Sequence, residues 1–185
     1  VIDEINSYKD SPGDDVYDRF EEALFKGHPL GQPILGSADS VNAITSDELH
    51  RFVKEKFLPS RMAFSIVADI DEGKMENEVL RLVKKYFGES KSQAPTSERL
   101  LSKPELILFD QTVDKHNHEV NAVIGGVAPS LYEENERIAT VLMSNILGGP
   151  SANAILSDIL REKKGWVYGV ECSYIQYSET GILAI

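Results

Sequence analysis

A polar stretch without sustained periodicity divides the chain into two parts of similar length. Residues 88–103, GESKSQAPTSERLLSK, contain a proline and many small polar side chains, a composition typical of a linker. We therefore predict that the 185 residues form two structural units. Residues 1–88 would belong to the first unit, residues 89–103 to the linker and residues 104–185 to the second unit.

The first part alternates helical and strand patterns. Residues 14–26 and 72–87 carry apolar side chains at three- and four-residue spacing, which predicts amphipathic helices. Residues 62–68 form a short apolar run typical of a buried strand. Thr45 and Glu48 have the spacing of a capping box, which predicts the start of a further helix. A helix, a strand and a helix in this order are typical of a layered α/β unit.

The second part opens with two predicted strands, residues 105–109 and 119–127, the latter containing a glycine pair. Paired glycines let another backbone approach closely, which suits a peptide-binding edge, and a bulge is the simpler explanation. A helix is predicted over residues 133–147, followed by a second helix between Ser151, its N-cap, and Gly165. A further strand is predicted over residues 167–177.

Arg161 and Tyr168 flank the predicted turn at Gly165, where a helix end needs a left-handed residue. We expect Arg161 in the last helical turn and Tyr168 at the start of the next strand, so that the two can face one another. Spacing alone favours the simpler interpretation, an arginine that complements the helix dipole and a half-buried strand tyrosine.

The residues around this pair resemble a known family. ILGG followed by LREKKGWVYGV is similar to the pattern LGGG…LRExxGLxYxV of the pitrilysin/insulysin (insulinase-like, inverted HxxEH) zinc metallopeptidases. The resemblance implies that Arg161 and Tyr168 are catalytic residues of a second domain, which hold the substrate backbone over the zinc of the first. Residues 150–154 depart from the family, whose members often have Gly-x-x-Ser-Arg there.

The N-terminal residues VIDEINSYKDSP resemble the family stretch VVLEEIxMYEDxP, whose second glutamate is a zinc ligand. The resemblance thus implies that Glu4 is a metal ligand and that zinc is the cofactor of the full-length protein. Two imidazoles and one carboxylate leave a fourth zinc position for water. Taken alone, Glu4 would be an ordinary solvated helix residue.

None of the four histidines belongs to an HxxEH motif, so that motif is expected in a preceding segment of a longer protein. The segment itself is therefore expected to be inactive and not to retain zinc. His28 and His50 are predicted to be structural. His116 and His118 would share one face of a strand and form a weak metal clamp, but the nearby sequence offers no third ligand.

The resemblance implies an α+β fold in which a sheet with helices packed on one face occurs twice. Residues 1–88 would close the catalytic-type domain, and residues 104–185 would open a substrate-holding, peptidase-like domain. The implied function is zinc-dependent hydrolysis of peptide bonds in peptides or small proteins. The alternative is a non-catalytic peptidase-like subunit with a structural or peptide-binding role, and a dimer or such a partner subunit remains open. A scaffold domain without peptide chemistry would make the Arg161 and Tyr168 match an accident.

Composition narrows the remaining classes of protein. The net charge of −11 argues against a nucleic-acid surface, which needs clustered Lys and Arg. No apolar run approaches the roughly 18 residues of a membrane span. Cys172 is the only cysteine, so no intrachain disulfide can form. Cytoplasm, matrix and periplasm all stay open, and a bacterial protein would be cytoplasmic or periplasmic.

Overall fold

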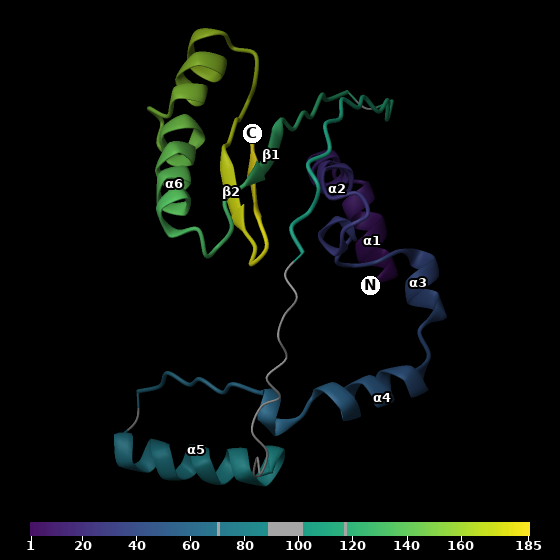
Figure 1. Cartoon of the computed structure of the whole chain (residues 1–185), viewed down its shortest axis with the longest axis vertical. Helices are drawn as coiled ribbons and strands as arrows, with labels where there is room; N and C mark the ends of the chain where they lie inside the picture. Colours follow the sequence, from purple (N-terminus) through teal and green to yellow (C-terminus); the bar gives the residue numbers. More distant parts are fainter. Residues whose placement is uncertain (70, 89–101, 117) are drawn as a thin grey trace. The chain divides into compact units, whose positions relative to one another are not determined.

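The structure, a computed structural model, describes residues 1–69, 71–88, 102–116 and 118–185 and contains helices and a small antiparallel sheet (Figure 1). The predicted α+β class is therefore confirmed. The chain divides into two compact units, one made of Val1–Val41 with Leu100–Ile185 and the other of Asn42–Arg99. The predicted boundaries at residues 88 and 104 remain a prediction, since most of the predicted linker lies outside the described residues.

The larger unit contains most of the regular structure. Its helical segments are α1 (Ile2–Lys9), α2 (Pro12–Leu24), the 3-10 turn η1 (Pro29–Gly31), α6 (Glu134–Gly148) and the π-helical η3 (Ser157–Lys163). Pro12 opens α2 at a position where the missing N–H costs no hydrogen bond, and acidic residues in the first turn complement the helix dipole. Sequence periodicity thus located α2 and α6 to within a few residues.

Three short strands form the sheet of this unit in the order β1-β3-β2. The strands are β1 (Gly125–Ala128), β2 (Ser173–Gln176) and β3 (Gly181–Ala184), and both pairings are antiparallel. The ladder extends past β1 and β3 through two hydrogen bonds between the backbones of Ile124 and Ile185, 2.9 and 2.8 Å long. The central strand, β3, lies near the end of the chain and joins β1 to β2.

The core lies between β3 and α2. Ile182 is fully buried and packs, with Ala184, against Phe20 and Leu24 of α2 and against Phe25, the residue that follows the helix. Phe20 and Leu24 are four residues apart, so they lie on one face of the helix. A helix from the start of the chain thus covers the sheet formed by its end.

Helix α6 lies along β2 (Figure 1) and is packed through small side chains. Thr140, Ser144 and Gly148 repeat every four residues and are buried. The apolar stripe from which the helix was predicted is instead largely exposed, as Leu142 (61%) illustrates. Periodicity therefore identified the helix, whereas the small residues show which side meets the sheet.

Several predicted strands are shorter or absent in the described part of the chain. Residues 62–68 and 105–109 are not strands, because no described segment pairs with them. The strand predicted over 119–127 is reduced to β1, and the strand predicted over 167–177 is reduced to β2. A strand requires a hydrogen-bonded neighbour, and apolar patterning alone does not provide one.

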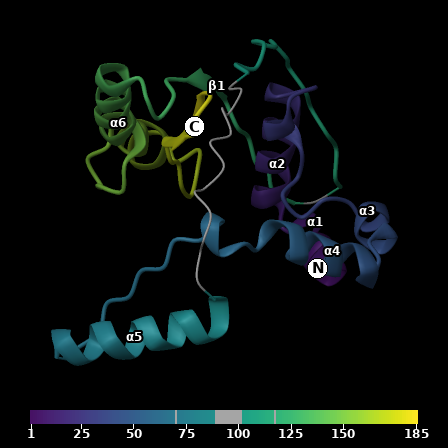
Figure 2. The same cartoon turned by 60° about the horizontal axis from the view of Figure 1, so that its bottom comes forward.

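The smaller unit is built on two amphipathic helices, α4 (Ser46–Lys56) and α5 (Glu72–Phe87) (Figure 2). The predicted capping box is confirmed: Thr45 N–H donates to Glu48 Oε2 at 2.9 Å, and Glu48 N–H donates to Thr45 Oγ1 at 3.3 Å. The short helices α3 (Ala38–Ala43) and η2 (Pro59–Arg61) precede and follow α4. Among the described residues, no helix is long and apolar enough to cross a membrane.

Candidate functional site

Close backbone contacts at the end of α6 require the glycine pair Gly148 and Gly149. A Cβ on Gly148 would lie 2.5 Å from the backbone nitrogen of Cys172, and one on Gly149 would lie 2.7 Å from the carbonyl oxygen of Asn145. Cys172 N–H donates to the Gly148 carbonyl at 3.0 Å. The ILGG motif thus fixes the end of α6 against the chain that leads into β2.

Helix η3 begins later than predicted and is a π-helix, in which each backbone hydrogen bond spans more residues than in an α-helix. Ser151 is not its N-cap, because residues 151–153 form a turn in which the Ser151 carbonyl accepts from Ala154 N–H at 3.0 Å. At the other end, Lys164 N–H donates to Ile159 and Trp166 N–H to Leu160, at 3.1 and 2.9 Å. These long steps are typical of a π-helix, a feature often found at functional sites.

Gly165 ends this helix with φ of +62°, in the left-handed region. The predicted left-handed turn is therefore present, and Arg161 lies in the last turn of η3 as expected. Arg161 Nε donates to Glu162 Oε1 at 2.8 Å, and both side chains are about half exposed. A surface ion pair of this kind is worth at most about 1 kcal/mol. The guanidinium can therefore exchange this partner for another.

Tyr168 does not open a strand, contrary to the prediction. It lies at a bend five residues before β2, and its side chain is fully exposed (104%). The reason is that the strand begins only where Ser173 pairs with Ala184 of β3. The described part of the chain has no hydrogen bond or ion pair between Tyr168 and Arg161. The two side chains are nevertheless both accessible on either side of the Gly165 turn.

Glu4 lies in the first turn of α1 and is exposed. Among the described residues, no group of three or more His, Cys, Asp and Glu side chains could hold a metal ion. Glu4 offers one carboxylate, whereas a catalytic zinc site takes three protein ligands. The described residues alone therefore do not form a zinc site.

The histidines have local roles where the structure describes them. His28 Nδ1 accepts from Leu30 N–H at 3.2 Å and caps η1, and its Nε2 lies 3.0 Å from the Ser102 carbonyl. His116 lies 3.4 Å from the Asp114 carboxylate. The predicted clamp with His118 is not on a strand, and residue 117 lies outside the described residues.

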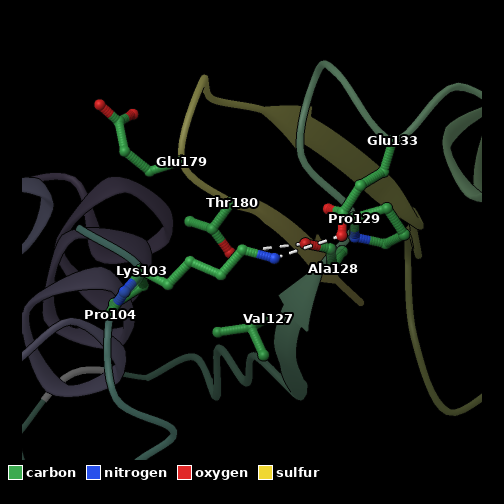
Figure 3. A pocket seen from close by; sticks show the side chains of 8 residues that line it. All are labelled: Lys103, Pro104, Val127, Ala128, Pro129, Glu133, Glu179 and Thr180. Carbon is green, nitrogen blue, oxygen red and sulfur yellow. Dashed lines mark hydrogen bonds and ion pairs between the residues drawn. The ribbon is translucent and has the colours of Figure 1, made fainter. Parts of the chain in front are cut away.

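A pocket of about 350 Å³ opens at the end of β1 (Figure 3). Lys103 crosses it and pairs with Glu133 Oε1 at 3.3 Å, while Glu133 Oε2 accepts from Ser130 N–H at 2.6 Å. The Ser130 hydrogen bonds, followed by the one from Lys103, lower the pKa of Glu133. Sequence reasoning missed this pocket because only folding brings Lys103 beside β1. Neither Arg161 nor Tyr168 lines it.

A second group missed from the sequence joins α2 to the end of β2. Tyr177 Oη donates to Glu21 Oε1 at 3.2 Å. Burial raises the pKa of Glu21, and burial together with the Glu21 charge raises the pKa of Tyr177 to about 12. Tyr17 also lies in this group, and its buried hydroxyl makes no hydrogen bond. Glu21 and Tyr177 are 156 residues apart in the sequence, so no local pattern could reveal their contact.

The sequence matches the family model described as the peptidase M16 inactive domain over residues 43–185. Among its relatives is an uncharacterized zinc protease of Bacillus subtilis, 28% identical over 186 residues, with 100% of this chain and 43% of the relative covered. Another, from Mycobacterium leprae, is 29% identical over 192 residues, with 100% and 41% covered. The chain spans less than half the length of these curated relatives.

Solved structures share the fold. A peptidase M16 inactive domain from Pseudomonas fluorescens superposes with a TM-score of 0.74 at 18% identity, covering 99% of this chain and 43% of that one. A protease from Helicobacter pylori gives 0.69 at 19% identity, covering 96% and 42%. A chain of complex III2 from Candida albicans gives 0.70 at 16% identity, covering 99% and 44%.

Proposed function

The chain belongs to the family of the peptidase M16 inactive domain, and from this premise we propose that it is a segment of a zinc-dependent metalloendopeptidase. The observation that carries the proposal is that relatives named zinc proteases match the whole chain. Residues 1–88 would close the domain that holds the metal, and residues 104–185 would open the domain that holds the substrate. The substrate class would be peptides or small proteins.

Arg161 and Tyr168 would donate hydrogen bonds to the carbonyl oxygen of the cleaved bond. Hydrolysis places negative charge on that oxygen, and a guanidinium and a phenol can both donate to it. The exposure of both side chains beside the Gly165 turn supports this role. Arg161 would have to turn from Glu162 toward the substrate, which costs little because the ion pair lies at the surface.

Glu4 would contribute one carboxylate to the zinc site, and the remaining ligands would come from a segment outside this chain. Zinc, when bound, lowers the pKa of water and so provides a nucleophile at neutral pH. Because Glu4 supplies only one ligand, the segment alone would neither retain zinc nor cleave peptides. An exposed position in the first turn of α1 leaves its carboxylate accessible.

The test uses the full-length protein with Glu4→Gln, and with Asp3→Asn as a matched control from the same helical turn. We expect Glu4→Gln to lower the zinc content, measured by elemental analysis, and to abolish peptide cleavage, while the control keeps both. Stoichiometric zinc in the Glu4→Gln protein would show that Glu4 is not a ligand.

The second candidate is a non-catalytic peptidase-like subunit. Two observations favour it: the matching family model describes an inactive domain, and one similar fold occurs in a chain of complex III2. Such a subunit would bind peptides or a partner without hydrolysing them. A purified full-length protein that contains no zinc and cleaves no peptide would support this candidate over the peptidase.

A further inference from the structure

Trp166 is exposed beside the two residues assigned to the substrate carbonyl. Its side chain is 71% exposed, and it is the only tryptophan of the chain. Val167 is half-buried, whereas Trp166 and Tyr168 on either side of it are exposed. This alternation places the indole and the phenol on the outer side of the same loop. Two residues span at most about 7 Å, so the two side chains start close together.

Lys164 lies over the indole of Trp166, with its Nζ 5.5 Å from the ring centroid. The neighbouring cations are paired with carboxylates: Arg161 with Glu162 and Lys163 with Asp158. In the described part of the chain Lys164 has no carboxylate partner, and its contact is with the ring. A cation over an exposed aromatic face is worth about 0.5–1 kcal/mol, and it leaves the other face of the ring available.

Building on the proposed function, we propose that Trp166, with Lys164 over one face of its ring, forms a subsite for a large apolar side chain of the substrate peptide. Aromatic residues and arginine contribute most of the binding energy at many interfaces, and this loop presents Arg, Trp and Tyr within eight residues. An extended peptide advances about 3.3 Å per residue. A reach of about 7 Å from Tyr168 therefore corresponds to a side chain within two residues of the cleaved bond.

The experiment uses the full-length protein and pairs of peptides that differ only by Phe or Ala at one position. This position is moved through the two residues before the cleaved bond and the two residues after it. We expect kcat/KM to be roughly tenfold or more higher for Phe at one of these positions. Trp166→Ala should remove this preference, so that the kcat/KM values for the Phe and Ala peptides differ by no more than about twofold. Trp166→Phe should restore most of the preference, and Lys163→Met should not change it.

The outcomes separate this inference from the function on which it rests. Tyr168→Phe should slow the Phe and Ala peptides equally, because it acts on the carbonyl and not on the side chain. If Trp166→Ala keeps the wild-type ratio between the peptides, or if Trp166→Phe does not restore it, the subsite is wrong. If the full-length protein cleaves neither peptide, the proposed peptidase activity fails. In that case the affinities of the Phe and Ala peptides, measured by fluorescence anisotropy, test the subsite. The wild-type protein should bind the Phe peptide more tightly, and Trp166→Ala should lose this preference.

Discussion

Arg161 uses one of its five N–H donors in the ion pair with Glu162, and Tyr168 is fully exposed. Neither side chain is fixed by packing, so the geometry that serves a transition state would have to form when substrate binds. This is common, because catalytic hydrogen bonds are often loose before the substrate complex forms. The left-handed turn at Gly165 redirects the chain between the two residues.

Replacing Tyr168 with Phe in the full-length protein removes one hydrogen-bond donor and leaves the ring. We expect kcat to fall roughly a hundredfold or more, since such donors are worth about 2.7 to 4 kcal/mol at oxyanion sites. Zinc content should not change. Steady-state kinetics check the first expectation and elemental analysis the second. Tyr132→Phe, at another exposed tyrosine, is the control and should keep the wild-type kcat. Equal rates for both variants would show that Tyr168 has no catalytic role.

At the scale of elements, the sequence predicts helices much better than strands. The Thr45 and Glu48 capping box and helix α5 follow from residues close together in the sequence. Strand β1, by contrast, exists because β3 pairs with it, and the paired residues Gly126 and Leu183 are 57 positions apart in the sequence. The same limit applies to the site: the left-handed turn at Gly165 was predictable, but the exposure of Tyr168 and the Lys103 pocket depend on pairing and packing of distant segments.

The close contact between the end of α6 and the chain that leads into β2 requires glycine at position 148. Gly148→Ala would place a methyl group 2.5 Å from the backbone nitrogen of Cys172, so the helix end or the strand must move. Overpacking of this kind costs about 1–3 kcal/mol. We expect the free energy of unfolding, measured by urea denaturation, to fall by that amount.

Gly126→Ala is the matched control for this substitution, because a Cβ at Gly126 has no atom within 4 Å. Its effect on unfolding should be small or slightly stabilising. A Gly148→Ala protein as stable as the Gly126→Ala protein would show that Gly148 is not constrained by Cys172.

At the scale of the whole molecule, the larger unit is held together by contacts between the first 41 residues and the last 86. Phe20, Leu24 and Phe25 supply the apolar part, and the hydrogen bond from Tyr177 to Glu21 supplies the polar part. Asp15 strengthens the same connection. Burial alone would raise its pKa, but hydrogen bonds from Arg19 and Lys115 lower it overall. Helix α2 thus carries one carboxyl group that favours the charged form and another, Glu21, that favours the neutral form.

The pH dependence of unfolding follows from the raised pKa of Glu21. Burial disfavours its carboxylate, so the folded state binds this proton more tightly than the unfolded state, where the pKa is near 4.5. The stabilisation from this group is complete below pH 4.5 and is lost as the pH rises through the raised pKa.

Glu21→Gln keeps an oxygen that accepts from Tyr177 but carries no charge. We therefore expect this variant to unfold at higher urea concentration than wild type at pH 7, with the difference shrinking below pH 4.5. Glu22→Gln, at the exposed neighbouring position, should show no such pH-dependent gain. If Glu21→Gln is less stable than wild type at pH 7, the charged carboxylate strengthens the contact between α2 and β2, and burial is not the dominant influence on Glu21.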